Sequence, residues 1–136
     1  LAQTQAAYLE ACNELFATLD EIDAVLANSR YLCGDCVTLA DIRLFTTLFR
    51  FDIAYYGIFK CNRRRIQDYQ HLGSYLRDLY QLPGVADTCD LESVKQDYYG
   101  NLFPLNPGGI IPAGPDMSSL LVPHGRENIG KSTANS

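Results

Sequence analysis

The chain has 136 residues, a formal net charge of −5 and an isoelectric point near 4.8. The length suits one domain with a hydrophobic core of its own. The acidic charge disfavours nucleic acid as a partner, because no basic excess is available to neutralise phosphates. No apolar run approaches the roughly 18–20 residues that a membrane-spanning helix needs. Because the first residue is Leu1 rather than Met, we expect a piece of a longer protein.

Apolar residues at steps of three and four predict a long amphipathic helix over about residues 4–28. Its inner stripe is predicted to contain Leu9, Cys12, Leu15, Phe16, Leu19, Ile22 and Leu26. Its solvated outer face is predicted to carry Glu10, Glu14, Asp20, Glu21 and Asp23.

The segment 31–52 contains the strongest helix-start signal in the chain. Thr38 and Asp41 have the Thr-x-x-Asp spacing of a capping box. In such a box the threonine hydroxyl accepts from the aspartate amide, and the carboxylate accepts from the threonine amide. Val37 and Ile42 flank the box at the spacing of a hydrophobic staple. We expect these four residues to start a helix over about 39–55 and to have a structural role only.

Two more helices are expected after an irregular connection near Gly57 and residues 60–65. One covers about 70–81 and is stopped by Pro83-Gly84, which a short helical turn follows through about residue 89. The other covers 91–99. The inward residues of the helix over 70–81 are predicted to be Leu72, Tyr75, Leu76, Leu79 and Tyr80.

The composition changes after Tyr99, because five of the six prolines and six of the ten glycines lie in residues 100–136. We therefore predict an all-α helical bundle over 1–99 and a long Pro/Gly-rich tail over 100–136, which packs on or between bundles. The residues expected to lie along the helices as a strap are Phe103, Leu105, Ile110, Ile111, Leu120 and Leu121. Residues 127–136 are predicted to be mobile.

The pair Cys33 and Cys36 has the C-x-x-C spacing of redox and zinc sites. The strand-to-helix context of a redox motif is missing, and no second cysteine pair completes a zinc site. A coincidence in a turn is the favoured interpretation, with a regulatory disulfide and a metal half-site as alternatives. The odd total of five cysteines favours reduced thiols in an intracellular compartment.

Two further features could meet a ligand. A basic run could steer an anion or form ordinary ion pairs, and it contains Arg50, Lys60, Arg63, Arg64 and Arg65. The tyrosine pairs 55–56 and 98–99 could give phenol donors to a polar aromatic ligand, or could simply pack. No Ser/His/Asp arrangement and no phosphate-binding loop can be argued.

The segment Tyr31-Leu-x-Gly-Asp-x-x-Thr-Leu-Ala-Asp41 resembles the capping box and staple of the glutathione S-transferase C-terminal domain. Further segments resemble one class within that family, the glutathionyl-hydroquinone reductases, or xi-class, omega-like glutathione transferases. They are RFD at 50–52, FKCN at 59–62, YLRDLYQ at 75–81, PGVA at 83–86, NPxGIIPxGP at 106–115 and PHGR at 123–126.

The resemblance implies an upstream thioredoxin-like domain with a catalytic cysteine, so no catalytic residue is expected in this chain. It also implies glutathione as co-substrate, no metal, and aromatic quinol conjugates as substrates. Tyr98 matches the tyrosine that contacts the quinol oxygen, and Tyr55 matches a second tyrosine facing the pocket. At two positions the chain departs from the family pattern, with Ile58 in place of a frequent histidine and Gly100 in place of a basic residue.

Two functions follow from the residues and the resemblance together. The first is the substrate-binding half of a reductase that removes glutathione from glutathionyl-hydroquinones. The second is a non-catalytic scaffold, or a subunit of a larger assembly. We expect a homodimer or such a subunit, with an intracellular, cytoplasmic location and an organelle as the alternative.

Overall fold

The computed structural model describes residues 3–100, 106, 108–115 and 117–130. Within them the regular structure is helical, apart from one isolated β-bridge between Tyr31 and Gly34. The α-helices are α1 (Gln5–Leu26), α2 (Leu39–Arg50), α3 (Gln70–Tyr80) and α4 (Leu91–Lys95). Two π-helical turns, η1 (Phe51–Tyr55) and η4 (Gln96–Gly100), continue α2 and α4, and the 3₁₀ turns are η2 (Ile66–Asp68), η3 (Ala86–Thr88) and η5 (Ser118–Leu121). The all-α prediction is confirmed.

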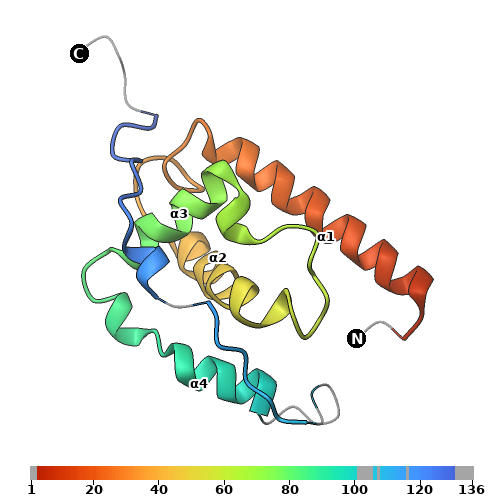
Figure 1. Cartoon of the computed structure of the whole chain (residues 1–136). Coiled ribbons are helices and arrows are strands. Elements are labelled where there is room, and N and C mark those ends of the chain that lie inside the picture. The colour runs from red at the N-terminus through yellow and green to blue at the C-terminus, as the bar shows by residue number, and fades with distance from the viewer. Residues whose placement is uncertain (1–2, 101–105, 107, 116, 131–136) are drawn as a thin grey trace.

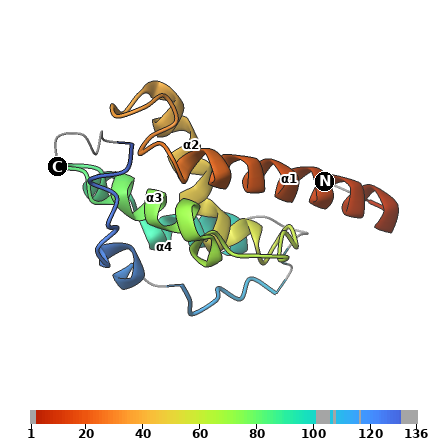
Figure 2. The same ribbon diagram turned by 90° about the horizontal axis from the view of Figure 1, so that it is seen from above.

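The helices pack around α2 and α3, with α1 on one side and α4 on the other (Figures 1 and 2). All five residues predicted to face inward on α3 are buried. Among the described residues no helix is both long enough and apolar enough to cross a bilayer.

The inner stripe of α1 is shorter than its sequence pattern predicts. Cys12, Phe16, Leu19 and Leu26 are buried, whereas Leu9 near the N-terminal end of the helix is 44% exposed. Leu15 and Ile22 are half-buried against the core. The reason is geometric: this long helix extends beyond most of the bundle at its N-terminal end (Figure 2), where Tyr8 packs against the core and donates to the Lys60 carbonyl at 2.7 Å.

The prediction that Asp23 lies on the solvated face of α1 is wrong. Its carboxylate accepts hydrogen bonds from the amides of His71 at 3.0 Å and Leu72 at 2.8 Å. These amides belong to the first turn of α3, where the helix itself supplies no acceptors. Asp23 therefore caps α3 from another helix and joins α1 to it.

The capping box at the start of α2 is present. The Asp41 carboxylate accepts from the Thr38 amide at 2.9 Å, and the Thr38 side chain faces the Asp41 amide while its hydroxyl donates to the carboxylate at 3.2 Å. The structure adds two tertiary donors to this carboxylate, the Leu32 amide at 3.0 Å and the Tyr75 hydroxyl at 2.6 Å. Asp41 is fully buried, so one side chain both starts α2 and holds α3.

The residues at the staple positions are more exposed than the capping pair. Val37 is 37% exposed and Ile42 is 43% exposed. They are part of a group of exposed apolar side chains at the start of α2 that also contains Leu39.

The two π turns lie against each other and bring the ends of α2 and α4 together. In η1 the Tyr56 amide donates to the Phe51 carbonyl at 2.9 Å, which is the i to i−5 bond of a π-helix. The Tyr99 hydroxyl, in η4, donates to the Ile53 carbonyl at 2.8 Å. A Cβ atom on Gly57 would lie 2.5 Å from that hydroxyl, so the close approach requires glycine.

The C-terminal segment follows the helices, but the apolar strap prediction is mostly wrong. Ile110 is 78% exposed and Leu121 is 64% exposed, and Ile111 also points outward. Leu120 packs against the core as predicted, and Met117, which was not predicted, does so as well. Phe103 and Leu105 lie outside the described residues. The 3₁₀ turn η5 was not predicted, because four residues are too few to show a period.

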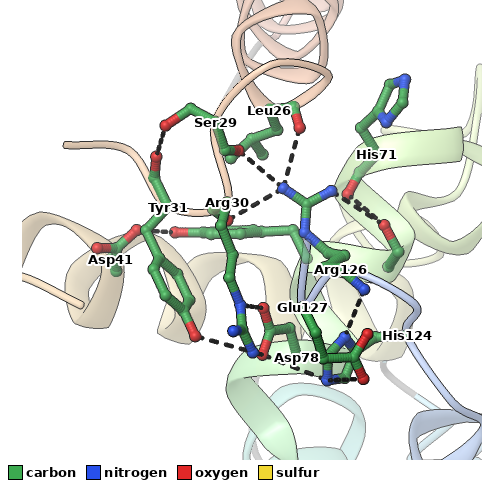
Figure 3. A network of polar contacts seen from close by, with 12 residues as sticks. Leu26, Ser29, Arg30, Tyr31, Asp41, His71, Asp78, His124, Arg126 and Glu127 are labelled. Carbon is green, nitrogen blue, oxygen red and sulfur yellow. Dashed lines mark hydrogen bonds and ion pairs between the residues drawn. The ribbon is translucent and has the colours of Figure 1, made fainter. Parts of the chain in front are cut away.

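Arg126 fixes this segment to the bundle (Figure 3). Its side chain is 1% exposed, and Nη2 donates to the carbonyls of Leu26, Ser29 and Arg30 at 2.9, 2.9 and 3.0 Å. Nη1 donates to the Ser74 hydroxyl at 3.2 Å. Of the region predicted to be mobile, residues 127–130 form a turn after this arginine, in which the Ile129 amide donates to the Arg126 carbonyl. Residues 131–136 lie outside the described part.

Asp78 on α3 joins the same network through its carboxylate (Figure 3). Arg30 donates to both of its oxygens, at 2.9 and 3.0 Å, and the Tyr31 hydroxyl lies 3.4 Å from Oδ1. His124 Nε2 lies 3.5 Å from the same oxygen, while its Nδ1 accepts from the Arg126 amide at 3.0 Å. The network ties the α1–α2 link and the C-terminal segment to one helix.

Candidate functional site

The two tyrosines singled out in the sequence meet in space. The hydroxyl oxygens of Tyr55 and Tyr98 are 3.4 Å apart, and their rings pack edge to face at 5.7 Å between centroids. Phe59 contacts both rings, at 5.4 Å from Tyr55 and 6.2 Å from Tyr98. Tyr55 belongs to η1 and Tyr98 to η4, so the two π turns create the pair.

A cavity of about 260 Å³ opens beside this pair. It is lined by Arg50, Val94, Asp97 and Tyr98. The cavity therefore offers a phenol, a guanidinium and a carboxylate around an aliphatic side chain. Such a mixture suits an aromatic ligand that carries oxygen substituents, because the ring needs apolar contact and the oxygens need donors.

Burial raises the pKa of the Tyr55 hydroxyl, with a further contribution from the hydrogen bond to Tyr98, and Arg50 opposes the shift. Tyr55 therefore keeps its proton at neutral pH. Each hydroxyl can donate one hydrogen bond and accept others, so one member of the pair can donate to its neighbour while the other donates to a ligand.

The other sequence candidates do not gather here. Cys33 and Cys36 are exposed free thiols at the turn before α2, and Cys33 Sγ lies 3.8 Å from the Thr38 hydroxyl oxygen. Within the described residues no three His, Cys, Asp or Glu side chains cluster as metal ligands would. His124 takes part in the buried network around Asp78, whereas the His71 imidazole points away from it (Figure 3).

Most of the basic run pairs within the protein and does not form an anion-steering patch. Arg65 pairs with Asp68, Arg63 donates to Asn13 and packs over Phe16, and Arg64 packs 3.9 Å from the centroid of Tyr69. Arg50 alone lines the cavity beside Tyr98. The sequence did not predict that Arg50 lies beside Tyr98, because the two residues come together only where η1 and η4 meet in space.

The helical fold limits the class of protein, and comparison with known proteins identifies it. A sequence profile described as "Glutathione S-transferase, C-terminal domain" matches residues 5–78, which is more than half of the chain. The chain belongs to this family.

Its relatives narrow the class further and confirm the resemblance drawn from the sequence. Glutathionyl-hydroquinone reductase YqjG of Escherichia coli K12 is 44% identical over 126 residues, which are 93% of this chain and 38% of that protein. Glutathionyl-hydroquinone reductase PcpF of Sphingobium chlorophenolicum is 49% identical over 114 residues, which are 84% of this chain and 36% of that protein. The chain therefore spans well under half of the length of these relatives.

Solved structures agree with this assignment. The glutathione-bound structure of YqjG matches with a TM-score of 0.89 over 93% of this chain and 41% of that one, at 44% identity. A Xi-class glutathione transferase from Natrialba magadii also matches with a TM-score of 0.89, at 44% identity, over 93% of this chain and 38% of that one.

Proposed function

We propose that this chain is the helical, substrate-binding part of a glutathione-dependent reductase that removes glutathione from glutathionyl-hydroquinones. The observation that carries the proposal is the Tyr55–Tyr98 hydroxyl pair beside a cavity of mixed polarity. The names of the relatives support the substrate class. In this proposal the partners are glutathione, aromatic quinol conjugates and a second copy of the protein.

The proposed reaction uses a cysteine thiolate from an upstream domain. The thiolate attacks the sulfur of the conjugate, the sulfur–carbon bond breaks, and the ring carbon takes its electron pair and then a proton. A glutathione thiolate next attacks the mixed disulfide, which releases oxidised glutathione and restores the cysteine.

Tyr98 would donate a hydrogen bond to an oxygen of the quinol ring. Negative charge develops on the leaving ring system, and a phenol donor placed at that oxygen stabilises it. Tyr55 would orient Tyr98 through the contact between their hydroxyls. Phe59 would keep both rings in place by packing against them.

The test is glutathione-dependent release of menadiol from the hydroquinone form of glutathionyl-menadione by the full-length protein. We expect turnover that requires both glutathione and the upstream cysteine. A folded full-length protein that releases no hydroquinone from this conjugate would reject the reductase function. We also expect the upstream sequence to contain a Cys-Pro pair after its first strand.

A non-catalytic scaffold is the second candidate, and Gly100 is the observation that favours it. The chain lacks the basic side chain usual there, and a Cβ atom at this position would meet only the flexible end of Gln96, at 2.3 Å from Nε2. A scaffold would bind glutathionyl-menadione without turnover, or would not bind it. Equilibrium dialysis of the conjugate alongside the activity assay separates these outcomes.

A further inference from the structure

A second, larger cavity of about 420 Å³ lies between the helices and the C-terminal segment. Its volume is within the range of about 300–1,000 Å³ that small-molecule sites occupy. The helices contribute Phe49, Ile53, Leu76 and Leu91 to its apolar wall. The C-terminal segment forms the opposite side with Pro115, Met117, Leu120 and Val122.

The C-terminal side of this cavity is held by polar contacts. The buried ammonium of Lys95 donates to the Ala113 carbonyl at 3.1 Å. The Gln81 side-chain amide donates to the carbonyls of Leu120 at 2.9 Å and Val122 at 2.8 Å. Arg126 fixes the chain farther on (Figure 3). These contacts hold the segment over α3 and leave the space beneath it open, although protein interiors normally close such spaces.

Arg77 lines this cavity, and no charge partner for it lies in the part of the chain that the structure describes. Its Nε atom is buried without a hydrogen-bond partner, and within the described residues no hydrogen bond or ion pair to its side chain is present. The side chain as a whole is half-buried and lines the cavity, so its guanidinium can meet an anion or a polar molecule there, and the unpaired Nε atom makes such a partner favourable.

The other charged groups around the cavity are already satisfied. Arg65 donates to both carboxylate oxygens of Asp68, at 3.1 and 3.0 Å. The Asp52 carboxylate accepts from the amides of Ile66 at 2.6 Å and Gln67 at 3.1 Å. Arg77 is therefore the one cation among these four lining groups that remains available to a ligand.

We propose that this cavity binds a small organic acid with an apolar body, whose carboxylate pairs with Arg77. A guanidinium matches a carboxylate with two parallel N–H···O bonds. The apolar body would lie between Leu76 and the Met117–Leu120 side of the cavity. This site shares none of its lining residues with the cavity beside Tyr98, so it is independent of the proposed reductase function.

Octanoate is a suitable probe, with 1-octanol as a neutral probe of the same chain length. Met117 is the single methionine of the sequence and lines the cavity, so a ¹³C-labelled methionine methyl group reports on this place alone. We expect octanoate to shift the Met117 methyl signal of the whole chain saturably. We expect 1-octanol to bind at least about tenfold more weakly, because it cannot form the charged pair.

The variant Arg77→Gln should weaken octanoate binding at least about tenfold and leave 1-octanol binding unchanged. Arg43→Gln is the matched control, since Arg43 is exposed on α2 and lines neither cavity. The proposal is overturned if octanoate does not shift the Met117 signal, or if 1-octanol binds as tightly as octanoate. Both results come from the unmodified chain and remain decisive even if Arg77→Gln fails to fold. Equal octanoate binding by a folded Arg77→Gln variant would also overturn it.

Discussion

Tyr55 and Tyr98 are 43 positions apart in the sequence, and their hydroxyl oxygens lie 3.4 Å apart. The pair depends on two helices that both end in a π turn, and on the Tyr99 hydroxyl that links η4 to the Ile53 carbonyl of η1. A π turn inserts one residue and changes the direction of the side chains that follow it. The position of each tyrosine is therefore set by an irregularity in its helix.

Tyr98→Phe should lower kcat for glutathionyl-menadione in the full-length protein by about tenfold or more, because the variant loses a donor to the ring oxygen. Tyr55→Phe should have a smaller effect, since it acts through Tyr98. Steady-state kinetics of both variants check this order. Tyr56→Phe is the matched control, because the neighbouring Tyr56 does not contact Tyr98 in the aromatic cluster. Normal turnover by Tyr98→Phe would remove that residue from the proposed role.

Asp41→Asn should lower the free energy of unfolding by about 2–4 kcal/mol, because the fully buried carboxylate accepts bonds from Leu32, Thr38 and Tyr75. Urea unfolding measures the change. Asp87→Asn is the control, because Asp87 is exposed. A loss no larger than that of the control would show that the capping carboxylate has no special role.

The loss of stability in Asp41→Asn should also depend on pH. Burial alone would raise the pKa of Asp41, but the bonds from Leu32, Tyr75 and Thr38 hold its pKa below the ordinary value. The stabilisation that the Asp41 carboxylate gives to the folded state is therefore complete above the pKa of an unfolded aspartate, about 3.9. It is lost as the pH falls through the lower pKa of Asp41 in the folded state. The difference in unfolding free energy between the unmodified chain and Asp41→Asn should narrow in acid. A difference that widens in acid would contradict this assignment.

Asp23→Ala should cost about 1 kcal/mol, the usual loss when a helix cap is removed. The carboxylate serves the His71 and Leu72 amides of α3, although it stands on α1. Amide hydrogen exchange should become faster at those two positions. Glu21→Ala, on the exposed side of the same helix, should leave both the stability and the exchange unchanged.

Arg126→Met should destabilise the chain by about 2–4 kcal/mol, because three carbonyls and the Ser74 hydroxyl lose a buried charged donor. It should also release the C-terminal segment, so that trypsin or chymotrypsin cuts there first. Arg43→Met is the control for removing an arginine. Unchanged protease resistance would show that Arg126 does not hold the segment.

The regular helices could be predicted from the sequence because their signals are local. The stripes of α1 and α3 repeat over several turns, and Thr38 and Asp41 mark the start of α2 within four residues. The tyrosine pair was reached through resemblance, because no local pattern states that residues 55 and 98 meet.

The features that the sequence did not predict depend on single polar side chains whose partners lie far away along the sequence. Asp23 and Arg126 each look solvent-exposed in the sequence, since a charge on a helix face or in a Pro/Gly-rich tail is normally hydrated. Their partners are backbone groups, which carry no sequence signature. The cavity beneath the C-terminal segment was missed for the same reason, because Gln81 and Lys95 hold it open through carbonyl contacts.

The bond from Arg126 to the Leu26 carbonyl spans 100 positions and has a consequence for synthesis of the chain. Translation proceeds from the N-terminus, and domains usually fold as they leave the ribosome. The carbonyls at the end of α1 must remain hydrated until Arg126 has emerged. The C-terminal end of α1 is therefore completed only after residue 126 has been made, and a nascent chain halted before that residue would expose this helix end to chaperones.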